Sequence, residues 1–222
     1  MKKKYLSPLL IVMINLFCRE KSFHELKVDT TDFIPNTVFA SGENLSSPKF
    51  RTLKEKYLLD TVFHGEQNEF KRILLLRDWI RERIKISDFE NLYPGDGYAE
   101  AILDAALKGH GFHCGHYMIV QNAIMNAYGY VTRCLGAGAG VKGSADGHHG
   151  MNEIWLNQYQ KWFLSDAKYN HHFERNGIPL SALEIRDEYL KNKAVEIVLV
   201  KGPERVPILS DKVANEKGEM VE

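Results

Sequence analysis

The stretch GFHCGHYMIVQNAIMNAYG, residues 111–129, decides the fold. It predicts a helix from Cys114 to Tyr128 that ends at Gly129, because glycine readily adopts the left-handed conformation found after helices. The apolar residues of this helix fall on nearly every side of it rather than along one stripe. A helix with that pattern is usually central and buried. We therefore expect the rest of the domain to pack around it.

Helical patterns dominate the part of the chain before Cys114. Ser47 and Pro48 are typical of the N-cap and the first position of a helix. Residues 66–86 carry apolar side chains at three-to-four spacing, and residues 98–109 show a shorter pattern that Gly109 stops. We expect these helices to precede the central one.

After the central helix the pattern changes to short strands rich in β-branched and aromatic residues. The expected strands are residues 130–135, 151–156 and 161–166. Residues 136–150 are so rich in glycine that they predict a loop. A capping box from Ser181 to Glu184 begins a helix over residues 181–193, and residues 194–200 read as a further strand. Helices followed by antiparallel strands indicate the α+β class, with the central helix packed on the sheet.

Composition sets the broad class of protein. The 222 residues suffice for one medium domain, and the hydrophobic share of 44% is that of an ordinary globular protein. Lys+Arg and Asp+Glu balance at 29 each. No basic field therefore favours a nucleic-acid partner.

The first residues, MKKKYLSPLLIVMINLFC, have the layout of a bacterial export signal. A basic start precedes an apolar stretch too short to span a membrane comfortably, and Cys18 follows. Such a segment resembles a lipoprotein signal, although Phe17 stands where a small residue is usual. Lipidation of Cys18, a plain signal peptide and an uncleaved anchor all remain open. We expect an exported protein, periplasmic or at the cell surface, that touches the membrane only through this segment.

The boundaries of the domain follow from the polar segments on either side of it. Residues 1–18 are the expected signal peptide, residues 19–46 are a polar linker or arm, and residues 47–209 form the domain. Residues 210–222 read as a polar, frayed tail. The sequence leaves the oligomeric state open.

The sequence has three cysteines, Cys18, Cys114 and Cys134, which are too few for a disulfide-stapled scaffold. A bridge between Cys114 and Cys134 is one reading, and a buried, unreactive sulfur is another. A third reading makes Cys114 reactive. At a helix start it faces backbone N–H groups and the positive end of the helix dipole, which favour thiolate over thiol.

Two later residues fit a cysteine nucleophile. His149 ends the glycine loop, and Asp166 ends the strand of residues 161–166. If the two strands around residues 157–160 form a hairpin, both side chains meet at one end of the sheet. An aspartate that accepts a hydrogen bond from one imidazole nitrogen turns the other nitrogen toward the sulfur, as in a cysteine acyl-transfer triad. We expect Asp166 to lie near solvent at its strand end.

Five ordered blocks then carry a resemblance to a known family. They are RDWIRERIKI, GFHCGHY, GYVTRCLGAG, HGMNEIW and KWFLSDAKYN, spread over roughly residues 65–170. In these blocks the chain resembles the transglutaminase-like superfamily of cysteine proteins, which is related to papain-type enzymes. The resemblance implies a papain-like α+β fold with Cys114 as nucleophile, His149 as general base and acid, and Asp166 as the orienting residue.

The resemblance also implies a chemistry that needs no cofactor. Members form thioester acyl-enzymes from amides and resolve them with water or with an amine. Hydrolysis is favoured over cross-linking because water needs no second binding site. The expected partner is a peptide, a protein or an amide-containing component of the cell envelope.

Two details of the site depend on the neighbouring residues. Members usually have a polar side chain before the cysteine that completes the oxyanion hole, and here only His110 and His113 are candidates. His148 adjoins His149, and the spacing of four residues to Glu153 favours His149 as the base.

Two alternatives come from other functional classes. One is a catalytically inactive cell-surface binding module on the same fold. The other is a zinc site, for which the possible ligands are His110, His113, Cys114, His116, Cys134, His148, His149, His171 and His172. No CxxC or HExxH spacing occurs among them, and zinc would leave Asp166 without a role. We expect no metal, and we expect His24, His64, His171 and His172 to be exposed surface residues.

Overall fold

A computed structural model describes residues 47–87, 98–138, 148–208, 213–214 and 220–221. These residues belong to one unit that spans residues 40–222. The expected signal peptide and arm, residues 1–46, lie outside the described residues, as does most of the glycine-rich loop. Within the described ranges, no helix combines the length and the apolar character needed to cross a membrane.

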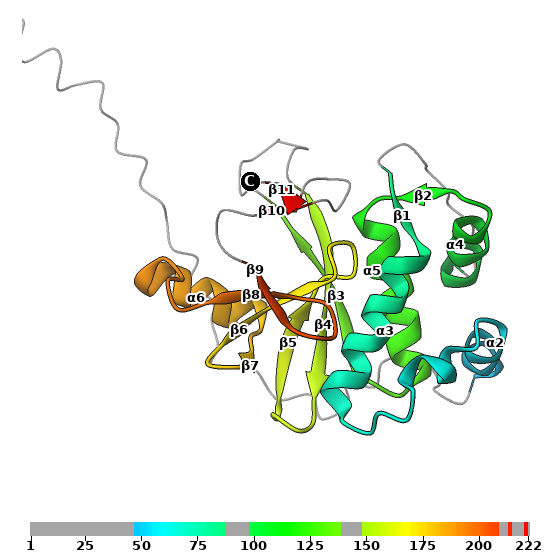
Figure 1. Ribbon diagram of the computed structural model, residues 1–222, viewed down its shortest axis with the longest axis horizontal. Coiled ribbons are helices and arrows are strands. Elements are labelled where there is room, and N and C mark those ends of the chain that lie inside the picture. The colour runs from blue at the N-terminus through cyan, green and yellow to red at the C-terminus, as the bar shows by residue number, and fades with distance from the viewer. Residues whose placement is uncertain (1–46, 88–97, 139–147, 209–212, 215–219, 222) are drawn as a thin grey trace, which may run out of the picture. The chain divides into compact units, whose positions relative to one another are not determined.

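Helix α5 (Cys114–Ala127) is the centre of the helical layer, as its sequence predicts. It packs against α2 (Pro48–Lys56), α3 (Glu69–Arg83) and α4 (Tyr98–Leu107), and against the sheet on another side. Figure 1 shows α3 and α5 between the sheet and the two shorter helices. The positive φ of 77° at Gly129 accounts for the end of α5, because glycine adopts that conformation without steric cost.

A three-stranded antiparallel sheet covers α5. Its order is β3 (Thr132–Ala137), β4 (His149–Leu156) and β5 (Lys161–Ser165). Alternate residues of β4 and β5 enter the core, where Ile154, Leu156 and Phe163 are buried with the side chains of α3 and α5. Burying one such side chain contributes about 1.5–3 kcal/mol. The α+β class, with the central helix packed on an antiparallel sheet, is therefore confirmed.

A second antiparallel sheet continues from the first. Its order is β7 (Ile178–Pro179), β6 (His171–Arg175), β8 (Val198–Lys201) and β9 (Val206–Ile208). Two backbone hydrogen bonds of 3.0 and 3.1 Å between Asp166 and His171 join the end of β5 to the start of β6. The chain thus reverses directly after Asp166, which decides the surroundings of that residue.

Several elements differ from the sequence prediction. The predicted strand of residues 194–200 begins only at Val198, because Lys193 and Ala194 both have a φ of 60° and turn the chain after α6 (Ala182–Asn192). The tail predicted to be frayed contains β10 (Val213–Ala214) paired with β11 (Met220–Val221). A short 3-10 helix, η1 (Leu59–Phe63), links α2 to α3.

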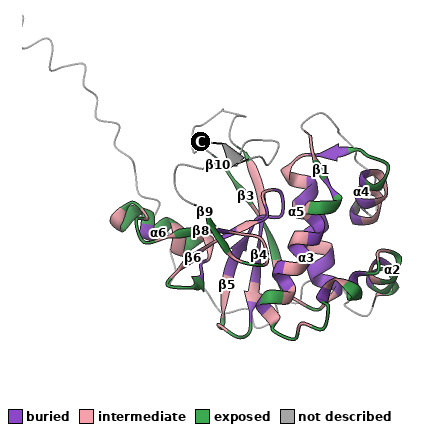
Figure 2. Cartoon of the chain, viewed as in Figure 1, coloured by how far each residue is buried: buried purple, intermediate pink, exposed green. Residues whose placement is uncertain are grey.

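Burial separates the helices by role. Helices α3 and α5 contribute most of the helical core, whereas Glu188 is the only buried residue of α6 among those described (Figure 2). The capping box of α6 is present as predicted, with the Ser181 hydroxyl accepting from the Glu184 N–H and the Glu184 carboxylate accepting from the Ser181 N–H. Local capping therefore fixes the start of α6 without a large buried face.

Candidate active site

The start of α5 is held by two short strands. β1 (Lys85–Ile86) follows α3, β2 (Gly111–Phe112) precedes α5, and the two pair in parallel. Only glycine fits at position 111, because a Cβ there would lie 2.5 Å from the Cβ of Ser87. The strand pair thereby ties the end of α3 to the start of α5 and fixes where Cys114 emerges.

Cys114 is the first residue of α5 and is half-buried. Its sulfur lies 3.9 Å from the backbone oxygen of His148. The helix is capped by His113, whose Nδ1 accepts a hydrogen bond of 3.2 Å from the Gly115 N–H. The His113 ring, one of the two candidates for the oxyanion hole, is therefore engaged in capping the helix that carries the cysteine.

The β4–β5 hairpin brings His149 and Asp166 together. Asn152 pairs with Ser165, so the first residue of β4 and the residue after β5 lie at the same end of the sheet. His149 Nε2 donates to Asp166 Oδ2 at 2.5 Å, and the second oxygen, Oδ1, accepts from the Tyr169 N–H at 3.1 Å. The bond at Nε2 leaves Nδ1 as the ring nitrogen available to the sulfur.

The pKa values of the three residues are coupled. Hydrogen bonding from His149 is the largest influence on Cys114 and, with the Gly150 N–H, holds the pKa of that thiol below its usual value despite burial. Burial disfavours the charged form of His149, but hydrogen bonds to Asp166 and Cys114 outweigh it and raise the pKa to about 9. Burial likewise opposes ionisation of Asp166, yet His149, His171 and the Tyr169 N–H lower its pKa. These surroundings favour thiolate, imidazolium and carboxylate together.

The expectation that Asp166 lies near solvent is wrong, because only 2% of its surface is exposed. The reversal into β6 covers the end of β5 and places His171 Nε2 3.7 Å from Asp166 Oδ2. The Tyr169 ring contacts two imidazoles: its centroid is 5.3 Å from that of His149, and it is stacked on the ring of His171 at 5.9 Å. The sequence analysis places neither residue beside Asp166, although both stand within five positions of it.

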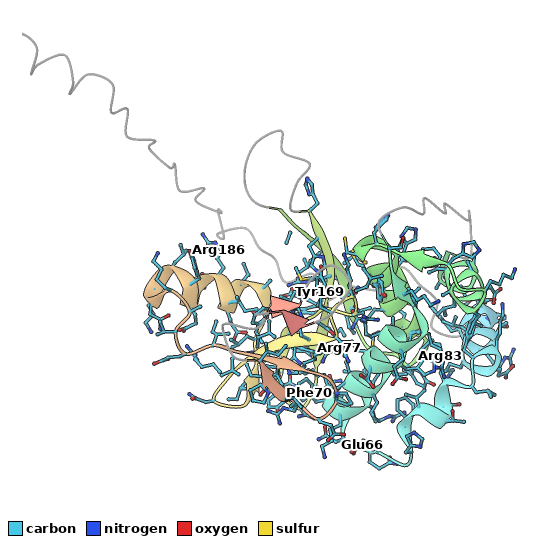
Figure 3. The ribbon with its side chains drawn as sticks, turned by 45° about the horizontal axis from the view of Figure 1, so that its top comes forward. Glu66, Phe70, Arg77, Arg83, Tyr169 and Arg186 are labelled. Atoms are coloured by element: carbon cyan, nitrogen blue, oxygen red, sulfur yellow. The ribbon has the colours of Figure 1, made fainter. Side chains whose placement is uncertain are left out.

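A buried polar network lies behind the turn from Asp166 to His171, the hairpin that joins β5 to β6. Arg77 of α3 is fully buried and donates from Nε to Asn170 Oδ1 at 3.0 Å and from Nη1 to His172 Nδ1 at 3.2 Å. His172 then donates from Nε2 to Glu174 at 2.7 Å, and Glu174 also pairs with Arg205. Figure 3 labels Arg77 on α3 and Tyr169 on the hairpin that this network supports. The hairpin after Asp166 is thus fastened to the helical layer.

The expectation that His171 and His172 are exposed is also wrong. His172 is fully buried, and 15% of the His171 side chain is exposed. Burial lowers the pKa of each to about 4, so both rings are neutral near pH 7. His64, in contrast, is exposed as expected.

Glu153 and Arg133, which lie in two of the five blocks that resemble the family, connect strands of the sheet beside the site. Glu153 of β4 is buried, accepts from Arg133 of β3 at 2.8 Å and also accepts from the Ala182 N–H at 2.7 Å. The buried carboxylate therefore joins two strands to the start of α6. On the opposite face, Gln121 of α5 donates to the Ser165 hydroxyl at 2.7 Å and fixes α5 against the residue before Asp166.

A cleft of about 230 Å³ opens beside Cys114, between the first turn of α5 and strands β3 and β4. Its side walls include Met118 of α5 and Cys134 of β3, and the backbone of Gly136 and Gly150 contributes to its lining. No Asp, Glu, Lys or Arg is among the described residues that line it. The cleft offers a bound molecule an apolar surface next to the sulfur.

The nine possible zinc ligands do not assemble. Within the described ranges, which include all nine, no three His, Cys, Asp or Glu side chains are grouped so as to hold a metal ion. Cys134 instead accepts a weak hydrogen bond from Asn152, and burial raises the pKa of its thiol. Cys114 and Cys134 are both free thiols.

A family model described as the transglutaminase-like superfamily matches residues 56–167, which is half of the chain. A search of curated proteins finds no significant match. A solved structure from Cytophaga hutchinsonii, named as that of a candidate cysteine protease, is 15% identical with a TM-score of 0.41. The match covers 70% of this chain and 49% of that one, so this chain spans about half the length of that protein.

Proposed function

The chain belongs to the transglutaminase-like superfamily, and from this premise we propose that it is a cysteine acyl-transfer enzyme that hydrolyses peptide or amide bonds. Cys114 is the proposed nucleophile, His149 the general base and acid, and Asp166 the residue that orients His149. The proposed substrate is a peptide, a protein or an amide-containing component of the cell envelope.

One observation carries the proposal. His149 is held between Asp166, at 2.5 Å from Nε2, and the Cys114 sulfur, and it is the largest cause of the lowered pKa of that thiol. A nucleophile, a base and an orienting carboxylate in that order are the parts that covalent catalysis requires. His148, in contrast, faces the cysteine with its backbone oxygen and has an exposed side chain.

Acylation consumes the amide. The Cys114 thiolate forms a bond to the carbonyl carbon, and the negative charge moves to the carbonyl oxygen. As the carbonyl reforms, the C–N bond breaks and His149 gives its proton to the leaving amine. The products of this half-reaction are a thioester on Cys114 and a free amine.

Deacylation restores the enzyme. A water molecule gives a proton to His149 while its oxygen bonds to the acyl carbon, and the C–S bond then breaks. The acid leaves, and the thiolate and imidazolium are regenerated. Hydrolysis is favoured over cross-linking because water requires no second binding site for an amine.

Alkylation by iodoacetamide across pH tests the proposal, with the labelled residue identified by peptide mass mapping. Cys114 should react with an apparent pKa below the roughly 8.5 of a free thiol, and His149→Ala should return it toward that value. His148→Ala is the matched control and should leave the rate unchanged. Cys134 should react more slowly, because burial raises the pKa of its thiol.

An unreactive Cys114 would contradict the proposal. Labelling of Cys114 no faster than that of a model thiol, together with no effect of His149→Ala, would contradict the enzyme proposal and leave a binding module on this fold.

Because the pKa of His149 is raised to about 9, the thiolate–imidazolium pair should persist from the lowered pKa of Cys114 up to about pH 9. Amide hydrolysis should then fall above that pH, since His149 no longer carries the proton that the leaving amine needs.

A further inference from the structure

Two paired glycines of β3 and β4 belong to the lining of the cleft beside Cys114. Gly136 of β3 pairs directly with Gly150 of β4. A Cβ on Gly150 would lie 3.3 Å from the Met118 sulfur and 3.4 Å from the Cα of Gly115, so that position faces α5. Directly paired residues of antiparallel strands share a face. The empty side-chain position of Gly136 therefore faces the same side.

Gly136 has room for a side chain. A Cβ there would meet no described atom within 4 Å, and Gly136 is not among the described glycines with positive φ. The backbone therefore does not require glycine at this position, and a larger residue would extend into the cleft. What glycine provides here is space next to the sulfur.

The lining favours an uncharged occupant. It consists of apolar side chains, the Cys134 thiol, glycine backbone, the His148 imidazole, and the Cys114–His149 pair, whose opposite charges compensate each other; no Asp, Glu, Lys or Arg is among the described lining residues. A carboxylate or ammonium entering it would lose hydration and would find the charges of Cys114 and His149 already paired with each other, whereas an apolar group gains by leaving water. A cavity of about 150 Å³ holds a benzene ring, so the roughly 230 Å³ here accommodates one aliphatic or aromatic side chain.

We propose that this cleft is the subsite for an apolar side chain of the acyl donor, adjacent to the carbonyl that Cys114 attacks, and that Gly136 sets its size. The substrate class is then a peptide or amide whose acyl residue is aliphatic or aromatic rather than charged. This inference rests on the proposed function, because it assigns the cleft to the substrate of Cys114.

Three chloromethyl ketones that share one reactive group test the inference on the full chain. They are the N-acetyl-leucine, N-acetyl-aspartate and N-acetyl-lysine derivatives. Each reacts by forming a C–S bond to Cys114 and releasing chloride, and peptide mass mapping identifies the modified residue. We expect the leucine probe to react roughly tenfold or more faster than either charged probe. Every rate is divided by the iodoacetamide rate of the same variant, so that differences in thiol reactivity cancel.

Substitutions in β3 test whether the cleft is the cause of the preference for the leucine probe. Gly136→Leu should fill the cleft and bring the three normalised rates close together, and Gly136→Ala should reduce the leucine preference only in part. Val131→Leu is the control, because Val131 directly precedes β3, is exposed and does not line the cleft. This control should keep the preference of the unmodified protein.

The outcomes separate the inference from the function. Fast iodoacetamide labelling with equal rates for the three probes overturns the subsite and leaves the enzyme proposal standing. A leucine preference that survives Gly136→Leu, or that Val131→Leu abolishes equally, also overturns it. Slow iodoacetamide labelling, like that of a model thiol, overturns the enzyme proposal itself.

Discussion

Asp166 uses its two carboxylate oxygens for different purposes. Oδ2 accepts from His149, while Oδ1 accepts from the Tyr169 N–H and so closes the turn into β6. Both bonds are made by a side chain that is 2% exposed. A buried charge with several donors is stabilised as a carboxylate, and loss of one donor leaves it poorly compensated. The residue therefore connects the chemistry of the site to the folding of the hairpin.

Replacing Asp166 by Asn should affect both properties. The amide can keep the bond from Tyr169, but its NH₂ group facing His149 would donate to Nε2 and hold the ring in the wrong tautomer. Turnover, or labelling of Cys114 at neutral pH, should fall roughly 10²–10⁴-fold. The free energy of unfolding should fall by about 1–3 kcal/mol, because a charge-assisted bond is lost.

Alkylation rates and urea unfolding of the same Asp166→Asn protein measure the two effects. Asp187→Asn, at a position whose side chain is 69% exposed, is the control and should change neither. Full reactivity in Asp166→Asn would exclude Asp166 from the site, and complete loss of the fold would assign it to structure alone.

At the scale of the element, β6 is distinguished by buried histidines. Burial lowers the pKa of His171 and of His172 to about 4, whereas an unfolded histidine has a pKa of roughly 6.5. Between these values the unfolded chain binds protons that the folded chain does not. These two residues should therefore lower the free energy of unfolding as the pH falls from 7 to 5, by about 1–2 kcal/mol per histidine; His149, whose pKa is raised to about 9, opposes this by roughly 1 kcal/mol.

Urea unfolding at about pH 7 and pH 5 tests this prediction. His172→Gln should weaken the pH dependence, since glutamine can accept from Arg77 and donate to Glu174 without titrating. His64→Gln, at an exposed position after η1, is the control. Glu174, with a pKa lowered to about 2, stays ionised in the folded chain, and the unfolded chain protonates it only slightly at pH 5, so its contribution to the slope is small. Equal slopes in His172→Gln and in the unmodified protein would contradict the account.

The elements that the sequence predicts are those with local signals. Helix α5 is predictable because its cap, its all-round apolar pattern and Gly129 lie within one short stretch. The contact between His149 and Asp166 is predictable, because a hairpin with its turn at residues 157–160 places both residues at the same end of the sheet. β1 and β2 are not predictable, since two residues show no periodicity.

The burial of β6 depends on a distant part of the chain. His171 and His172 look like surface residues when only their neighbours in sequence are considered. His172 is buried beside Arg77, which lies on a helix 95 positions earlier and supplies a donor inside the protein, whereas His171 lies against Asp166. A local sequence pattern gives no information about a partner so far away in the chain. The burial of Asp166 could not be predicted for the same reason. The sequence thus predicts that Cys114, His149 and Asp166 lie together, but it does not predict the polar network behind them.

At the scale of the whole molecule, the site exists only where segments far apart in sequence meet. Cys114 comes from the helical layer, His149 from the start of β4 and Asp166 from the junction of the two sheets. Gln121 and Arg77 hold the helices against that junction from two sides. The arrangement of the three residues therefore depends on the packing of helices against sheet, and thiol reactivity reports on the integrity of the whole fold.

The last prediction concerns the whole chain and its compartment. The basic start at Lys2–Lys4 and the apolar stretch that ends at Phe17 support the proposal that the protein is exported and processed before or near Cys18. Intact-mass measurement of cell-envelope and cytoplasmic fractions from a bacterium making the full chain tests this. We expect an envelope protein that lacks residues 1–17, with a diacylglycerol mass increment on Cys18 if that residue is lipidated. Cys18→Ala should remove any such increment. Val12→Arg should retain the unprocessed chain in the cytoplasm, because a charge interrupts the apolar stretch. An intact, unmodified chain in the cytoplasm of cells making the unmodified sequence would contradict export.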